Sequence, residues 1–323
     1  MRDVAGVRPV LTVPAAVVAL EPPAELGLVG ERQPLWKGLV RTARPRHWIK
    51  NTLVFAAPGA AGLLTDGSAL LRSFAAFAVF CVAASGAYFL NDAVDYEQDS
   101  RHPSKRRRPV AAGVVPVRLA LAVGVSSLAV AVAAGAFLGW RFAVAVAAYG
   151  AVNIAYNAGL RNEAVLDLAA VASGFVIRAI AGGFAIGVPL SEWFLVVVSA
   201  SSLFVVAGKR APAALDGIGG PSGGEPAVPR IDYPPVFLRY VRLLSSAVAL
   251  TAYCLWAFDK AAVAHNVWFE VTIVPFALAI LRYALLVERG LGASPEEVLL
   301  ADRTIIVLIA VWVALFALGV YGA

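Results

Sequence analysis

The amino-acid sequence predicts an all-α membrane protein, a polytopic bundle of about nine transmembrane helices. Hydrophobic residues make up 60% of the 323 residues and charged residues only 15%, whereas soluble domains average about 45–50% and about 25%. The apolar residues fall in runs of about 18–23 residues, long enough to cross about 30 Å of hydrocarbon. Charged residues gather between these runs, as they do in membrane proteins.

The first 35 residues differ in composition from the rest of the chain. They are rich in Pro, Val, Ala and Glu, and they lack the basic stretch and clean apolar core of a signal peptide. We therefore expect residues 1–35 to form a poorly ordered cytoplasmic tail. Residues 36–323 are expected to form a single transmembrane domain.

Nine apolar runs are candidate membrane spans, and Pro58 and Gly59 interrupt the first of them. The spans cover residues 47–64, 69–91, 117–138, 142–158, 164–186, 192–208, 237–257, 268–287 and 303–321. Basic residues are concentrated in the N-terminal tail and in the loops after the second, fourth, sixth and eighth spans. Because basic loops stay in the cytoplasm, we expect a multi-pass protein of the plasma (inner) membrane with a cytoplasmic N-terminus and an external C-terminus.

The net charge of +6 is explained by this loop pattern, which indicates membrane orientation and anionic ligands, not nucleic acid. Cys81 and Cys254 both lie inside apolar runs. Their positions imply neither a disulfide framework nor a metal-binding cysteine cluster.

An acidic motif ends the second apolar run. It has the pattern Asn-Asp-x-x-Asp-x-x-x-Asp, from Asn91 to Asp99. On an α-helix, Asp92 and Asp99 lie about 20° apart and Asp95 lies about 60° from Asp92. The three carboxylates therefore form one stripe, with the amide oxygen of Asn91 beside it.

Three like charges at the end of a membrane helix are costly unless cations neutralise them. Oxygen ligands with room for water and phosphate suit Mg²⁺, which would grip a diphosphate and make it a better leaving group. The alternative is a solvated acidic helix end balanced by the basic run that follows it. The sequence favours Asp92, Asp95 and Asp99 as magnesium ligands and catalytic residues on the cytoplasmic face.

This motif resembles the first aspartate motif of the UbiA prenyltransferase superfamily. The basic loop of residues 102–109 and the element from Tyr156 to Arg161 are similar to segments that follow it in that family. The resemblance covers about residues 40–323 and implies a UbiA-like helix bundle around a central cavity.

The sequence departs from the general family after the sixth apolar run. Typical members carry a second Asp-x-x-x-Asp motif there, whereas this chain has Lys209 and Arg210, which would bind a phosphate in place of a second metal ion. This basic pair and four other segments resemble the decaprenyl-phosphate phosphoribosyltransferases of actinobacteria. The four segments are residues 44–51, 174–183, 237–241 and 280–283.

That second resemblance implies Mg²⁺-dependent transfer of 5-phosphoribosyl from phosphoribosyl diphosphate to decaprenyl phosphate or another polyprenyl phosphate. The reaction releases diphosphate and serves arabinan precursor synthesis for the cell wall. Three phosphate groups would meet in such a site, so several cations are wanted. The expected substrate-binding residues are Lys50, Asn51, Asn91, Lys105, Arg108, Tyr156, Arg161, Asp167, Arg178, Lys209 and Arg210.

Several of these assignments have structural alternatives. Each basic residue could simply mark the cytoplasmic side of the membrane. Asp167 could be a structural partner of Arg161, and Arg178 could pair with an acid inside the bundle, because an arginine at that depth needs a partner or a wet cavity.

Two other functions stay open. An aromatic prenyltransferase of quinone synthesis would be expected to have the second acidic motif that is missing here. A transporter or non-catalytic lipid-binding membrane protein would leave the three-carboxylate stripe unexplained. The sequence leaves lipid chain length and homo-oligomerisation undecided.

Overall fold

The computed structural model of the chain describes residues 34–216, 231, 233–291, 298 and 301–322. The predicted tail of residues 1–35 lies almost wholly outside them. Within these ranges every regular element is a helix. The elements are α1 (Leu35–Ala43), η1 (Pro45–Phe55), α2 (Ala56–Ala60), α3 (Gly67–Val94), α4 (Tyr96–Arg101), η2 (Lys105–Arg107), α5 (Val117–Ala136), α6 (Trp140–Ala158), η3 (Leu160–Asn162), α7 (Leu166–Ile186), α8 (Glu192–Asp216), α9 (Pro235–Ala264), α10 (Trp268–Val271), α11 (Ile273–Glu288) and α13 (Arg303–Tyr321).

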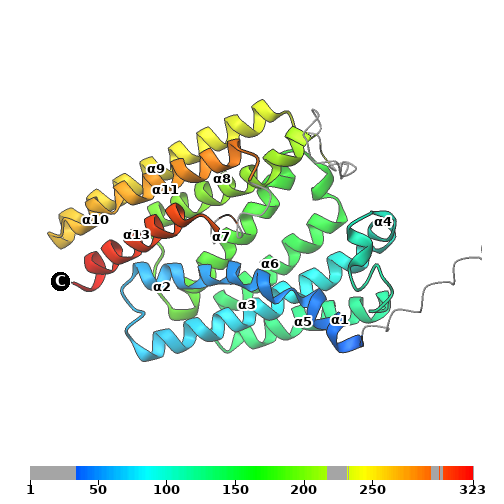
Figure 1. Ribbon diagram of the computed structural model, residues 1–323. Helices are drawn as coiled ribbons and strands as arrows, with labels where there is room; N and C mark the ends of the chain where they lie inside the picture. Colours follow the sequence, from blue (N-terminus) through cyan, green and yellow to red (C-terminus); the bar gives the residue numbers. More distant parts are fainter. Residues whose placement is uncertain (1–33, 217–230, 232, 292–297, 299–300, 323) are drawn as a thin grey trace, which may run out of the picture. The chain divides into compact units, whose positions relative to one another are not determined.

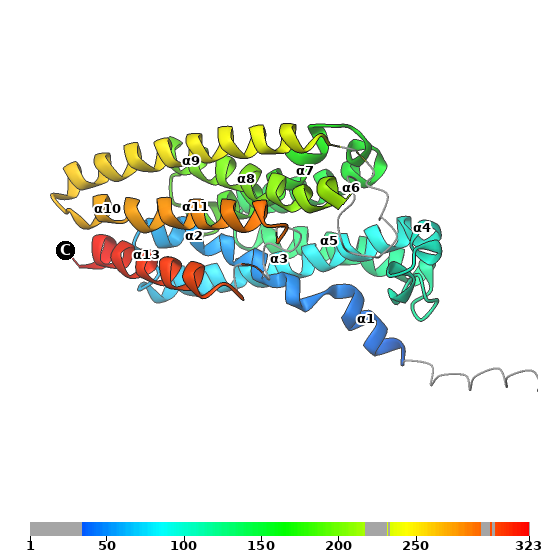
Figure 2. The same cartoon turned by 45° about the horizontal axis from the view of Figure 1, so that its top comes forward.

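Helices that follow one another in the chain pack against each other (Figures 1 and 2). Contacts run from α3 to α5, and then through α6, α7, α8 and α9 to α11 and α13. The 3₁₀ segment η1 lies against both α3 and α7. This places the N-terminal segment among the helices, where its side chains reach the interior of the bundle.

Seven of the described helical segments are long and apolar enough to cross a membrane, and they confirm seven of the nine predicted spans. An eighth predicted span, residues 142–158, coincides with α6. Its 19 residues would reach across about 28 Å. The polar side chains of Tyr149, Asn153 and Asn157 interrupt its apolar sequence.

The predicted span 47–64 is wrong as a single membrane helix. The segment forms the 3₁₀ helix η1 and then the short helix α2. Side chains three residues apart share one face of a 3₁₀ helix, and here that face carries Trp48, Asn51 and Val54. Trp48 Nε1 donates to Ser85 Oγ on α3 over 3.1 Å, and Asn51 and Val54 are fully buried.

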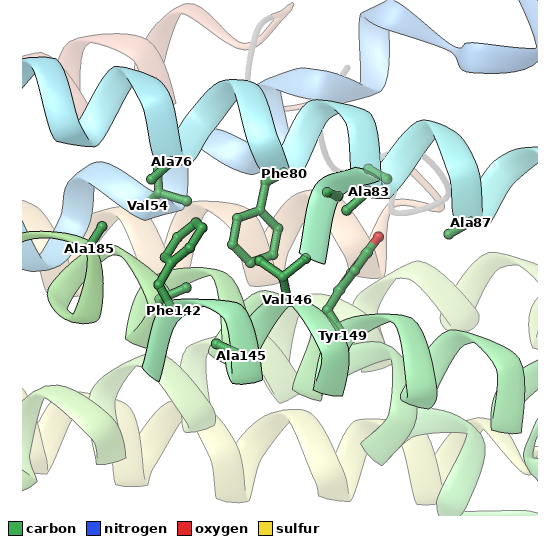
Figure 3. Packing of buried hydrophobic residues seen from close by; sticks show 13 residues of the cluster. Val54, Ala76, Phe80, Ala83, Ala87, Phe142, Ala145, Val146, Tyr149 and Ala185 are labelled. Carbon is green, nitrogen blue, oxygen red and sulfur yellow. The ribbon is translucent and has the colours of Figure 1, made fainter. Parts of the chain in front are cut away.

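Small residues let the helices approach closely, as is common in membrane bundles. A Cβ atom at Gly182 of α7 would lie 1.9 Å from the carbonyl oxygen of Val54, so only glycine lets η1 pack there. Beside this contact, the ring of Phe80 meets Phe142 and Tyr149 edge-on, with centroids 5.8 and 5.7 Å away. Figure 3 shows these rings among alanine side chains of neighbouring helices.

Candidate active site

The three predicted carboxylates are buried where α3 passes into α4. Asp92, Asp95 and Asp99 are 2%, 5% and 2% exposed. The α-helix breaks at Asp95, but the amide of Asp99 still donates to the Asp95 carbonyl over 2.8 Å. One guanidinium, that of Arg108, reaches Asp99 at 2.6 Å and Asp92 at 3.4 Å. Asp92 and Asp99 therefore share a face, as helical periodicity predicts.

Two further arginines from distant segments complete this acidic cluster. Arg44, the left-handed residue between α1 and η1, donates to Asp92 over 2.5 Å. Arg161 of η3 donates to Asp95 over 2.6 Å. The three carboxylates and three guanidinium groups carry no net formal charge between them, so the cluster is electrically balanced by the protein itself.

A second ion pair joins α7 to α8. Arg210 binds both carboxylate oxygens of Asp167, at 2.6 and 3.1 Å. Tyr156 donates to the same carboxylate over 3.0 Å. The alternative in which Asp167 pairs with Arg161 is therefore wrong, because Arg161 binds Asp95 and Arg210 binds Asp167.

The start of α7 is fixed by a strained residue. Val165 has a φ of +69°, which is costly for a β-branched side chain. Its amide donates to the hydroxyl oxygen of Tyr233 over 3.0 Å. Burial raises the pKa of the Tyr233 phenol. This hydrogen bond fixes the backbone just before Asp167, in the first turn of α7.

A cavity of about 1100 Å³ lies among η1, α3, α6, α7, α8 and the C-terminal helices. Trp193 and Arg210, seventeen residues apart on α8, both line it, so the cavity extends about 25 Å along that helix. Among the described residues its charged lining is wholly cationic, with Lys50, Arg178, Lys209 and Arg210 and no carboxylate. Six aromatic side chains that belong to one packed cluster line another part of the cavity, which we call its aromatic part: Trp193, Tyr253, Trp256, Phe276, Trp312 and Phe316.

The predicted site residues divide into two groups around this cavity. Six of them line it: Lys50, Asn91, Tyr156, Arg178, Lys209 and Arg210. The others do not line it: Asp92, Asp95, Asp99, Asn51, Lys105, Arg108, Arg161 and Asp167. Asn51 lies behind the wall, where its amide donates to Cys81 Sγ over 3.4 Å and its oxygen accepts from Arg178. Lys105 is half-buried in η2.

Sequence reasoning missed the polar face of α6. Tyr149, Asn153 and Asn157 line the cavity at intervals of four residues, which places them on one helix face. The side-chain oxygen of Asn157 is buried and accepts no hydrogen bond within the described part of the protein. The four-residue spacing of these polar residues within an apolar run could have indicated this polar helix face from the sequence.

The acidic cluster has the donor chemistry of a magnesium site. In the described residues no three Asp, Glu, His or Cys groups converge on one point as a complete metal cage. Mg²⁺ usually takes only one or two protein carboxylates and completes its shell with water and substrate phosphates. Buried carboxylates beside a cationic cavity fit that second arrangement.

Comparison with known proteins places the chain in a family. Residues 52–306 match the model of the UbiA prenyltransferase family, so the chain belongs to that family and is a multi-pass membrane protein. The fold agrees with a solved UbiA homolog from Archaeoglobus fulgidus, at a TM-score of 0.65 and 16% identity over 88% of this chain and 99% of that one. The same homolog bound to GPP and Mg²⁺ matches with a TM-score of 0.61 and 19% identity over the same shares.

A full-length relative lies in one branch of the family. The chain is 41% identical over 304 residues to the decaprenyl-phosphate phosphoribosyltransferase of Mycolicibacterium smegmatis, which covers 90% of this chain and 95% of the relative. The resemblance to this branch that the sequence motifs predict is thereby confirmed.

Proposed function

We propose that this protein transfers the 5-phosphoribosyl group of phosphoribosyl diphosphate to decaprenyl phosphate and releases diphosphate. The observation that carries the proposal is the cavity, which combines a wholly cationic charged lining with a long aromatic part. A sugar diphosphate and a lipid phosphate together demand both features. The identity to the mycobacterial relative supports this choice of substrates.

The donor diphosphate is assigned to the end of the cavity beside the acidic cluster. Asp92 and Asp95 would hold Mg²⁺, which when bound would screen the diphosphate and improve it as a leaving group. Arg44 and Arg161 already contact these carboxylates and would then have phosphate oxygens within reach. Lys209 of α8 would bind the donor from the opposite wall, as a charge-assisted contact.

The reaction requires the protein mainly to position the two substrates and to stabilise charge. The bond from the ribose C1 to the diphosphate oxygen breaks through an oxocarbenium-like transition state, as at other anomeric centres. The electron pair leaves with diphosphate, and an oxygen of the lipid phosphate attacks C1 from the opposite face with inversion. Because a phosphomonoester has a second pKa of about 6, the phosphate of the acceptor lipid is already ionised at neutral pH. The site therefore works without a general base, by positioning and electrostatic stabilisation.

The polyprenyl tail is assigned to the aromatic part of the cavity. Trp312 and Phe316 of α13 lie one turn apart and line it, together with Tyr253 and Trp256 of α9. Trp312 Nε1 donates to the hydroxyl of Tyr253 over 2.7 Å, which satisfies a polar group that would otherwise disfavour a hydrocarbon ligand.

The active site is assigned to the cytoplasmic face. Arg44, Arg108, Arg161 and Arg210 come from the tail and from the loops that the charge pattern places in the cytoplasm. Arg44, Arg108 and Arg161 bind the acidic cluster at the end of α3. Arg210 binds Asp167 at the start of α7. We further propose that residues 36–323 form a single catalytic domain.

A membrane assay with two substrate pairs tests the proposal. Membranes containing the protein are given labelled phosphoribosyl diphosphate with decaprenyl phosphate, or a labelled prenyl diphosphate with an aromatic acid. We expect a lipid-linked phosphoribose from the first pair only, and loss of this product in EDTA. A prenylated aromatic acid would identify the aromatic branch instead, and no product from either pair would favour a non-catalytic role.

A further inference from the structure

Among the described cations that line the cavity, Arg178 alone is buried. Arg178 of α7 is 5% exposed and lies within a membrane-spanning helix. Its guanidinium donates to Asn51 Oδ1 at 2.7 Å, to the Gly174 carbonyl at 2.7 Å and to the Tyr149 hydroxyl at 2.9 Å. All three acceptors are neutral.

The charge of Arg178 is held by these neutral acceptors and by the ring faces of Tyr149 and Phe175, 4.6 and 5.9 Å away, but it meets no counter-charge among the described residues. Arg44, Arg108, Arg161 and Arg210 each bind a carboxylate, whereas no acidic partner of Arg178 is found among the residues that the structure describes. A buried cation in a membrane is costly without a counter-charge. Arginine has five N–H donors, and the three bonds above leave two for a ligand. Because Arg178 lines the cavity, the missing anion would come from the cavity's occupant.

The position of the guanidinium distinguishes it from the donor cluster. It lies beside the carbonyl of Gly174, seven residues along α7 from Asp167, which corresponds to about 10 Å. Glycine at 174 permits this approach, because a Cβ there would already lie 3.3 Å from Arg178 Nη1. Arg178 is also the last residue of α7 along the chain that lines the cavity. It thus stands between the donor cluster and the deeper part of the bundle.

We propose that Arg178 binds the phosphate of the lipid acceptor, with Asn51 and Tyr149 holding the guanidinium in its orientation. This assignment rests on the proposed function and adds the group that selects a phosphorylated lipid. A lipid whose tail fills the aromatic part brings its phosphate to the boundary between apolar and polar lining. Arg178 gives that boundary a fixed positive charge, and the donor is left with Lys209 and the arginines of the acidic cluster.

A binding experiment without donor tests the assignment directly. Trp193, Trp256 and Trp312 line the cavity, so tryptophan fluorescence of the purified protein in micelles can report its occupant. Farnesyl phosphate and farnesol are the probes, which differ only in the phosphate. We expect the wild type to prefer farnesyl phosphate. Arg178→Gln should reduce that preference about 10- to 150-fold, as for other charge-assisted bonds, with farnesol binding unchanged.

Control variants separate this role from a structural one, in which Arg178 only fastens η1 to α7. Arg239→Gln removes an exposed arginine paired with Glu288 and should behave as wild type. Arg178→Lys keeps the charge and should keep part of the preference. The KM for phosphoribosyl diphosphate should stay unchanged in each Arg178 variant that folds. Inorganic phosphate should not displace farnesyl phosphate at matched concentration, because it lacks the tail.

Several results would overturn the assignment. These are a wild type that binds both probes equally, a Gln variant that keeps the full preference, or a parallel loss of farnesol and donor binding. If the Gln variant does not insert, an equal loss of both probes in Arg178→Lys overturns it as well. The proposed function has a separate readout, because a wild type without transferase activity would refute that function while leaving the phosphate preference measurable.

Discussion

Two neighbouring basic residues, Lys209 and Arg210, should fail in different ways when truncated. The sequence suggests one shared role, because both replace the second acidic motif of the family. In the structure both line the cavity, but Arg210 is bound to both oxygens of Asp167. Lys209→Ala should therefore impair substrate binding, and Arg210→Ala should first impair stability.

The magnitudes follow from the environment of each group. Losing one charge-assisted contact costs about 1.5–3 kcal/mol, so Lys209→Ala should raise the KM for phosphoribosyl diphosphate about 10- to 150-fold at 1.4 kcal/mol per decade. Breaking a fully buried ion pair costs about 3–5 kcal/mol, because the remaining charge is left unpaired. Asp167 is 4% exposed but Arg210 is 32% exposed, and solvent screening lowers the expected loss to about 2–3 kcal/mol.

Thermal unfolding in micelles and steady-state kinetics measure the two effects separately. Lys209→Ala should unfold like the wild type. Arg210→Ala should unfold at a lower temperature, and the double variant Asp167→Asn with Arg210→Ala should recover much of the loss, because no charge is then left unpaired. Equal KM changes with equal stability in the two single variants would refute this division of roles.

Three further outcomes are expected. Asp92→Asn or Asp95→Asn should nearly abolish turnover while the protein stays folded, because an amide still accepts the arginine bond but binds Mg²⁺ poorly; full activity in EDTA would contradict the metal assignment. Gly182→Val should destabilise the protein by at least about 1–3 kcal/mol through overpacking, since a Cβ would meet the Val54 carbonyl, whereas Gly67→Ala, with open space around it, should be silent in the same unfolding assay. In a background without native cysteines, a thiol reagent should label His265→Cys in intact cells and Arg107→Cys only after permeabilisation; external labelling at 107 would reverse the orientation.

Local regularities made much of the fold predictable. Seven spans follow from apolar runs whose length matches the bilayer, and Asp92 and Asp99 share a face because helical periodicity continues through the break at Asp95. The first span failed because hydropathy does not distinguish an α-helix from a 3₁₀ helix. In η1 the three-residue spacing of Trp48, Asn51 and Val54 carried that information, but its meaning depends on α3 and α7 being alongside.

Partnerships between distant residues were not predictable from the sequence. Asp167 and Arg161 are six residues apart and suggest a local pair, yet Asp167 binds Arg210, 43 residues away. The outcome depends on how α7 and α8 pack, which the spacing of charges along the chain does not encode. The polar face of α6 is a different case. The four-residue spacing of its polar residues is visible in the sequence, but the sequence does not show that this face borders a cavity.

The balance of charge around Asp92, Asp95 and Asp99 changes how the acidic motif should be understood. Taken alone, three carboxylates on a membrane helix require cations that neutralise them, and a metal ion is one source of that charge. In the folded chain Arg44, Arg108 and Arg161 meet that demand from three separate segments, so the cluster is balanced before any ligand arrives. On the proposed function, binding of a magnesium diphosphate would be an exchange: the carboxylates would hold the cation, and the guanidinium groups that they release would bind phosphate oxygens. Such an exchange conserves ion pairs in a poorly solvated site, where creating unpaired charges would be expensive.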